Sequence, residues 1–131
     1  MKLRPPAAAL LPLLLAVSLI ATAAADERWQ PVSGPALRSL LAGKEFGDGT
    51  HYAYRFLADG TFKGTEMGRD VLGRWRAEGA ELCTRRSKPR PVDECFELEH
   101  VGQHLRMLQG GQVVQDGHLS PAPSQSLKSS R

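Results

Sequence analysis

The spacing of the glycines is the feature of this sequence that most constrains its fold. All 13 glycines of the 131-residue chain follow residue 33 and recur at short intervals. The runs between them alternate apolar and polar side chains, a pattern typical of short antiparallel strands joined by tight turns. No run is long enough for a crossover helix, so the sequence predicts an antiparallel meander of about six to eight strands. Such a meander commonly curls into a barrel or half-barrel, which makes the predicted fold class all-β.

One segment departs from this pattern and comes before the predicted sheet. Residues 35–41 place three leucines at helical spacing, at positions 37, 40 and 41. Ser33 can cap the start of such a helix, and Gly43 can end it. The sequence therefore predicts one short helix ahead of the sheet.

A hairpin is predicted over residues 51–64, where Asp59 and Gly60 form a strong turn signal. A three-residue loop over 58–60 would pair Phe56 with Phe62 and place Gly60 in the left-handed conformation that such loops need. We expect Phe56, Phe62 and Trp75 to form the core. The alternating Tyr52 and Tyr54 stay open between the core and a ligand cavity, because their hydroxyl groups need polar partners.

The two cysteines lie on neighbouring predicted strands, over residues 81–86 and 94–100. In an exported protein such a pair is normally oxidised, so we predict a disulfide between Cys83 and Cys95. It would stabilise the fold by about 3 kcal/mol. Their spacing is not that of a C-x-x-C redox motif, which disfavours a redox or metal role. With the cysteines directly opposite, four further pairs follow: Leu82 with Phe96, Ala80 with Leu98, Arg85 with Asp93 and Glu81 with Glu97. Further strands are predicted over residues 71–76, 104–108 and 113–115.

The first 25 residues have the three zones of a secretory signal. Lys2 and Arg4 precede an apolar stretch over residues 10–20, and alanines at 23–25 offer a cleavage site. The apolar stretch is short for a membrane span, which disfavours a retained anchor. We therefore predict a protein that is periplasmic or secreted, with one domain over residues 26–119. Residues 120–131 are predicted to be a disordered tail, because their composition is poor in apolar residues.

Removal of the signal changes the charge that matters for partners. Lys2 and Arg4 leave with it, so 15 basic residues face 14 acidic ones and the formal net charge falls from +3 to +1. This balance gives no support to nucleic-acid binding or to a stable membrane anchor. The expected partner is an unknown protein or small ligand in the periplasm.

No catalytic motif stands out in the sequence, and we predict neither an enzyme nor a cofactor. The only metal hypothesis comes from His100 and His104, which flank the turn at 101–103 and could supply two ligands of a zinc or copper site. Ordinary half-exposed histidines at strand ends are the simpler interpretation, so no metal site is predicted.

The most distinctive polar feature is a basic loop between the two cysteines. Arg85, Arg86, Lys88 and Arg90 place four cations close together, and prolines at 89 and 91 stiffen the tip. Such a loop could bind an acidic protein surface, an anionic lipid or a phosphate group. The strand after it is acidic, which disfavours nucleic acid. The simpler alternative is a solvated hairpin tip.

Several segments together resemble a known group of proteins. They are residues 41–44 (LAGK), residues 54–61 (YRFLADGT) and residues 73–76 (GRWR), followed by the cysteine pair. The chain resembles small exported bacterial proteins with a lipocalin-like β-meander, including a domain of unknown function. It is faintly similar to periplasmic metalloprotease inhibitors, although their second Trp-rich segment has no counterpart here. The resemblance spans roughly residues 37–117 and implies a fold more than a function.

The sequence is compatible with three functions. The leading prediction is an exported, non-catalytic binding or interaction module whose disulfide-held basic hairpin contacts a partner. The first alternative is a carrier of a small ligand or metal that uses the barrel mouth. The second alternative is an inhibitor of a periplasmic enzyme.

Overall fold

The fold of the chain was obtained as a computed structural model that describes residues 2–8 and 28–123. Most of the predicted signal segment lies outside these residues, and so does the predicted tail from residue 124 onward. Within the described part, no helix is long and apolar enough to cross a membrane.

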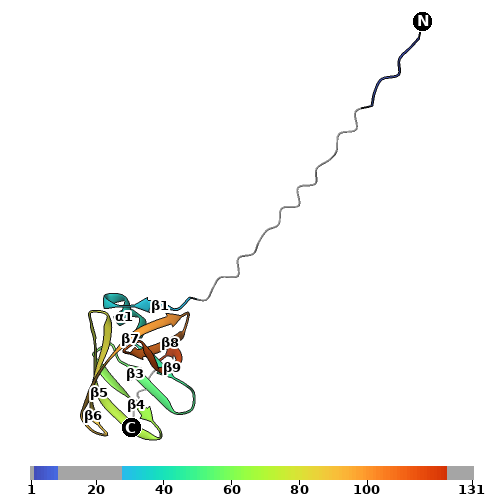
Figure 1. The fold of residues 1–131 in the computed structure, drawn as a ribbon. Coiled ribbons are helices and arrows are strands. Elements are labelled where there is room, and N and C mark those ends of the chain that lie inside the picture. The colour runs from blue at the N-terminus through green and yellow to red at the C-terminus, as the bar shows by residue number, and fades with distance from the viewer. Residues whose placement is uncertain (1, 9–27, 124–131) are drawn as a thin grey trace.

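The structure is all-β with a single short helix (Figure 1). Eight strands, β2 to β9, each pair antiparallel with the next one, and β9 pairs with β2 to close a barrel. Strand β1 adds to β7 outside this ring. The elements are β1 (Gln30–Val32), α1 (Gly34–Leu41), β2 (Lys44–Gly47), β3 (Tyr52–Phe56), β4 (Thr61–Glu66), β5 (Arg69–Glu78), β6 (Glu81–Lys88), β7 (Val92–Val101), β8 (His104–Gln109) and β9 (Gln112–Pro121).

The two ends of the barrel are built differently. Because the strands alternate in direction, the turns after β3, β5 and β7 lie at the same end as helix α1, which we call the plugged end. The turns after β2, β4, β6 and β8 lie at the other end, which we call the open end (Figure 1).

Helix α1 follows the predicted bounds and packs against β5 and β2. Its Leu37 and Leu41 side chains are fully buried. The guanidinium of Arg38 lies 5.0 Å from the centre of the Trp75 ring and donates a hydrogen bond of 2.8 Å to the Ala58 carbonyl. Gly43 ends the helix region with a φ of 76°, as the sequence predicts. The helix therefore contributes its leucines to the core and ties itself to the barrel wall.

The core is aromatic, as expected from the predicted hairpin. Phe56 and Phe62 lie opposite each other with ring centres 5.4 Å apart, and Trp75 meets Phe56 edge to face at 5.6 Å. The Trp75 indole donates a hydrogen bond of 2.8 Å to the Leu57 carbonyl, so its polar atom is satisfied. Gly60 has a φ of 90°, and the pairing of Phe56 with Phe62 confirms the predicted three-residue loop.

The pairing of β6 with β7 confirms most of the predicted register. Cys83 lies opposite Cys95, and three of the four further predicted pairs form. The fourth does not, because β6 begins at Glu81 and leaves Ala80 in the turn. Leu98 pairs instead with Val32 of β1, a short strand that the sequence pattern did not reveal.

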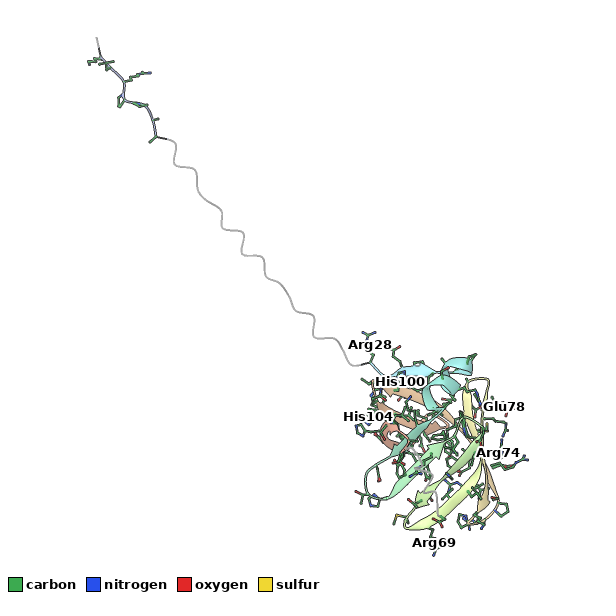
Figure 2. The ribbon with its side chains drawn as sticks, turned by 180° about the vertical axis from the view of Figure 1, so that it is seen from behind. Arg28, Arg69, Arg74, Glu78, His100 and His104 are labelled. Carbon is green, nitrogen blue, oxygen red and sulfur yellow. A yellow bond between two sulfur atoms is a disulfide. The ribbon has the colours of Figure 1, made fainter. Side chains whose placement is uncertain are left out.

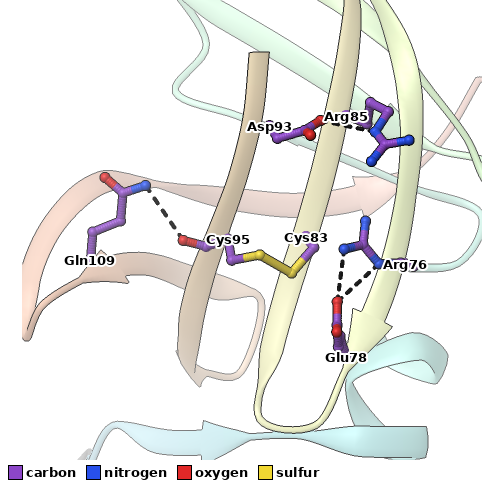
Figure 3. The surroundings of a disulfide bond; sticks show 7 residues. All are labelled: Arg76, Glu78, Cys83, Arg85, Asp93, Cys95 and Gln109. Atoms are coloured by element: carbon purple, nitrogen blue, oxygen red, sulfur yellow. Dashed lines mark hydrogen bonds and ion pairs between the residues drawn. A yellow bond between two sulfur atoms is a disulfide. The ribbon is translucent and has the colours of Figure 1, made fainter.

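The disulfide between Cys83 and Cys95 is present, as predicted, and joins Cα atoms 4.0 Å apart. It lies on the outer face of the wall, with the Arg85–Asp93 ion pair on the same two strands (Figure 3). The last strand, β9, runs to Pro121 and so extends two residues beyond the expected domain boundary at 119.

Candidate functional site

The open end of the barrel contains a cavity of about 850 Å³, which we call the cup. Inward-facing residues of β4 to β9 and the turns at the open end line it, because alternate residues of a strand face the barrel interior. Its apolar wall is formed by Val71, Val92, Phe96 and Val114, with Met67 and Pro89 nearer the solvent. A cavity of this size is in the range of small-molecule sites.

A network of charged and polar side chains lies at the base of the cup. The Arg86 Nη1 atom forms an ion pair of 2.9 Å with Oε2 of Glu66. The Tyr54 hydroxyl donates a short hydrogen bond to the same oxygen and accepts one of 3.0 Å from the amide nitrogen of Gln115. The Arg86 guanidinium also lies 5.5 Å from the Tyr54 ring centre and 5.8 Å from that of Phe62. Four strands thus supply the four members of this network.

This network separates the cup from the core. Beneath it the space available to a water-sized group is about 10 Å³, enough for one water molecule at most. The hydroxyl of Thr84 and the Nε atom of Arg86 are buried and have no hydrogen-bond partner among the described residues. A ligand that enters from the open end therefore meets the network as its floor.

The pKa shifts in the network preserve the usual ionisation states. Burial and the hydrogen bond to Glu66 raise the pKa of Tyr54 to about 12. Burial opposes the charged form of Glu66, but the hydrogen bonds from Tyr54 and Arg86 outweigh it and lower its pKa. Burial likewise opposes the charged Arg86, yet its contacts with Glu66 and Tyr54 raise its pKa. Through neutral pH the floor therefore holds a neutral phenol, a carboxylate and a guanidinium.

Comparison with family models, curated proteins and solved structures finds no match. The closed antiparallel barrel with one short helix is consistent with the lipocalin-like architecture that the sequence resembles. Architectures of this kind serve many functions, so function has to be argued from the cup itself.

The four predicted partner-binding residues do not form one patch. Arg85 faces outward and is paired with Asp93 at 3.0 Å, with 70% of its side chain exposed. Arg86 faces inward and is only 13% exposed. Lys88 and Arg90 are exposed at the tip of the hairpin, and Arg90 also lines the cup. The sequence held a signal for this division, since position 86 is in phase with the apolar Leu82 on the same strand.

The histidines that could have formed a metal site are also separated. His100 lies opposite the buried Leu105, whereas His104 lies opposite Val101, so the two rings face different sides of the sheet. His104 stacks instead on His118, with ring centres 4.7 Å apart, and is hydrogen-bonded to Asp116.

Among the described residues, only Glu81, Cys83 and Cys95 bring three potential metal-ligand atoms close together. The two sulfur atoms of that group are bonded to each other, so they are not available as thiolate ligands.

The sequence reasoning missed three members of the floor: Glu66, Tyr54 as a polar anchor, and Gln115. They lie on three different strands, and only the closure of the barrel brings them together. The one local signal was the unassigned hydroxyl of Tyr54, which needed a buried partner.

Proposed function

We propose that the chain is an exported, non-catalytic binding module that holds a small ligand in the cup. The observation that carries this proposal is a cavity of about 850 Å³ at one end of a barrel whose other end is sealed by α1. Barrels of eight strands are wide enough to hold one small ligand. The apolar wall can bury the body of a ligand, while the charged floor can orient it.

The ionisation of the floor supports binding without catalysis. A general acid or base works best when its pKa lies near the working pH. The shifts of Tyr54, Glu66 and Arg86 all move away from neutrality. These groups are therefore suited to hold fixed charges and hydrogen bonds against a ligand.

The basic hairpin formed by β6 and β7 also supports this function, because it forms one stiff side of the entrance to the cup. The disulfide ties β6 to β7 below the tip, and Arg90 faces the cup. Lys88 and Arg90 also remain available to an acidic partner at the open end, which keeps the hairpin's predicted interaction role. Replacing both by alanine should weaken such a complex and make it less sensitive to salt, without unfolding the domain. Unchanged partner binding would remove the interaction role.

Export is part of the proposal and rests on the three zones of the first 25 residues and on the disulfide. Secretion of the full chain from bacterial cells, followed by intact-mass analysis, tests it. We expect a mature chain that begins at Asp26 and contains one disulfide. A mature species that still carries residues 10–20 would contradict the proposal.

Ligand binding in the cup can be tested with two neighbouring substitutions. Val114 lines the cup, whereas Val113 does not, although the two residues are 45% and 46% exposed. A library of small organic fragments would be screened by protein-observed NMR against the mature domain. We expect hits that shift cup resonances, that are lost in Val114→Trp and that persist in Val113→Trp. Equal effects of the two substitutions would refute the cup as the site.

A further inference from the structure

The hydrogen-bonding groups that line the cup differ in whether the protein itself already supplies their partners. Arg86 directs Nη1 to Glu66, and its Nε atom is buried. The Gln109 side-chain amide nitrogen donates to the Cys95 carbonyl at 3.4 Å. Arg86 Nη1 and the Gln109 amide are thus engaged by the protein itself, whereas Arg86 Nε has no partner among the described residues.

The orientation of the Gln115 amide follows from its partner. The Tyr54 hydroxyl gives its proton to Glu66, so its oxygen must accept a hydrogen bond from the nitrogen of Gln115. The Gln115 carbonyl oxygen is left as an acceptor. The second oxygen of Glu66 is a further acceptor, since both of the Glu66 contacts use Oε2.

Glu94 is a carboxylate of the cup whose side chain has no partner among the described residues. It lies on β7 directly opposite the buried Thr84, so its side chain faces the cup. The residue is half-buried, and its side chain makes no hydrogen bond or ion pair with any described residue. Partial withdrawal of a carboxylate from water without a compensating partner costs free energy. A cation that enters the cup would supply that partner.

The charges of the cup also differ between its depth and its rim. Glu94 lies deeper in the cup than the hairpin tip, two positions from the buried Phe96, while the Glu66 carboxylate is already paired with Arg86. Arg69 and Arg90 lie at the rim, and Figure 2 shows Arg69 at the end of the barrel away from α1. A ligand with a positive inner end and a negative outer end would match both levels.

We propose that the cup binds an amphoteric ligand, with a protonated amine at Glu94 and a carboxylate at the rim arginines. This inference rests on the proposed function and specifies its ligand class. Arg90 precedes Glu94 by four positions along the hairpin wall, of which only the part from Val92 is strand. At about 3.3 Å per residue, the two charges of the ligand would be about 7–13 Å apart. A six-carbon chain is a suitable first spacer.

Four matched probes separate the contributions of the two charges: hexylamine, hexanoate, 6-aminohexanoate and hexanamide. Each would be titrated into the mature, disulfide-bonded domain, and shifts of cup resonances would be followed by NMR. We expect 6-aminohexanoate to bind most tightly and hexylamine next. Hexanoate and hexanamide should bind at least tenfold more weakly than hexylamine.

Substitutions then assign the charges to residues. Glu94→Gln should weaken hexylamine binding at least tenfold, while Glu97→Gln, on the outer face of the same strand, should leave it unchanged. Replacing Arg69 and Arg90 together by glutamine should lower the affinity for 6-aminohexanoate to that for hexylamine. The spectrum of each variant would confirm that the barrel is intact.

Three results would overturn the inference, and they differ from failure of the proposed function. Tighter binding of hexanoate than of hexylamine would refute the ligand class while the cup remains a binding site. Equal effects of Glu94→Gln and Glu97→Gln would refute Glu94 as the amine site. If none of the four probes binds, the ligand class is refuted. If the fragment hits are also insensitive to Val114→Trp, the cup itself is refuted.

Discussion

The plugged and open ends of this barrel are made by the same eight strands but differ in what lies inside them. Apolar side chains fill the plugged end, whereas charged side chains line a cavity at the open end. At the plugged end, Leu37 and Leu41 of α1 are fully buried. At the open end, Glu66 and Arg86 hold a charged floor beneath a cavity of about 850 Å³. The difference shows that closure of the barrel does not determine whether its interior is solid or hollow. Helix α1 seals one end, and the ion pair of Glu66 with Arg86 separates the core from the cup at the other.

The largest expected effect comes from the plugged end. Leu41→Ala should reduce the free energy of unfolding by about 2–5 kcal/mol, since it opens a cavity under a fully buried side chain. Chemical denaturation would measure this loss. Leu40→Ala is the matched control, because Leu40 is only partly buried against the same core and should cost clearly less. A similar loss for both would mean that the helix does not seal the end as described.

Removal of the disulfide acts on the wall that joins the two ends. Replacing Cys83 and Cys95 together by alanine should destabilise the domain by about 3 kcal/mol, because the short covalent loop no longer restricts the unfolded chain. Denaturation of the variant would be compared with that of the wild-type protein under oxidising and reducing conditions. Reduction should destabilise the wild-type protein and leave the variant unaffected. A variant as stable as the oxidised protein would contradict this account.

A smaller effect is expected at the floor of the cup. Arg86→Met leaves the Glu66 carboxylate without its cation and should cost about 1–2 kcal/mol, since solvent reaches Glu66 and screens part of the loss. The double variant Arg86→Met with Glu66→Gln removes both charges and should recover part of that stability. Denaturation of the two single variants and the double variant would give the coupling energy.

The same pair predicts a dependence of stability on pH. The pKa of Glu66 is lower in the folded protein than in the unfolded chain. Its contribution to stability is therefore complete above the unfolded value near 4.5 and is lost as pH falls through the lower folded value. Arg86→Met should flatten this part of the stability profile. An unchanged profile would contradict the assigned ion pair.

The smallest effect is expected one residue away, on the outer wall. Arg85→Met removes an ion pair whose two side chains are largely exposed, so its cost should stay below about 1 kcal/mol. Its comparison with Arg86→Met tests directly whether the two neighbouring arginines face opposite sides of β6. If Arg85→Met were the more damaging of the two, the inward assignment of Arg86 would be wrong.

Much of the fold could be predicted because its signals are local. The turn at Gly60 fixed the pairing of Phe56 with Phe62, and the cysteines fixed the register of β6 with β7. Strands β1 and β2 were missed because each is only three or four residues long and carries no clear alternation. Their place depends on partners far along the chain, which a local pattern cannot show.

The site could be predicted only in part, for a related reason. Arg86 was identified from the sequence, but it was grouped with Arg85, Lys88 and Arg90 because those residues are close in the chain. Adjacent residues of a strand face opposite sides, so the group was divided by the fold. The true neighbours of Arg86, Glu66 and Tyr54, come from other strands and carry no common motif.

The seam between β2 and β9 has a consequence for how this chain could be delivered. Lys44 pairs with Pro121, so the ring cannot close before residue 121 has been made. A ribosome or a translocation channel that still holds the last strand leaves the seam open. Contacts this distant in sequence form slowly. If the chain is exported as proposed, this delay keeps the precursor from folding into a closed barrel, so that it can pass through the translocation channel until β9 has crossed the membrane.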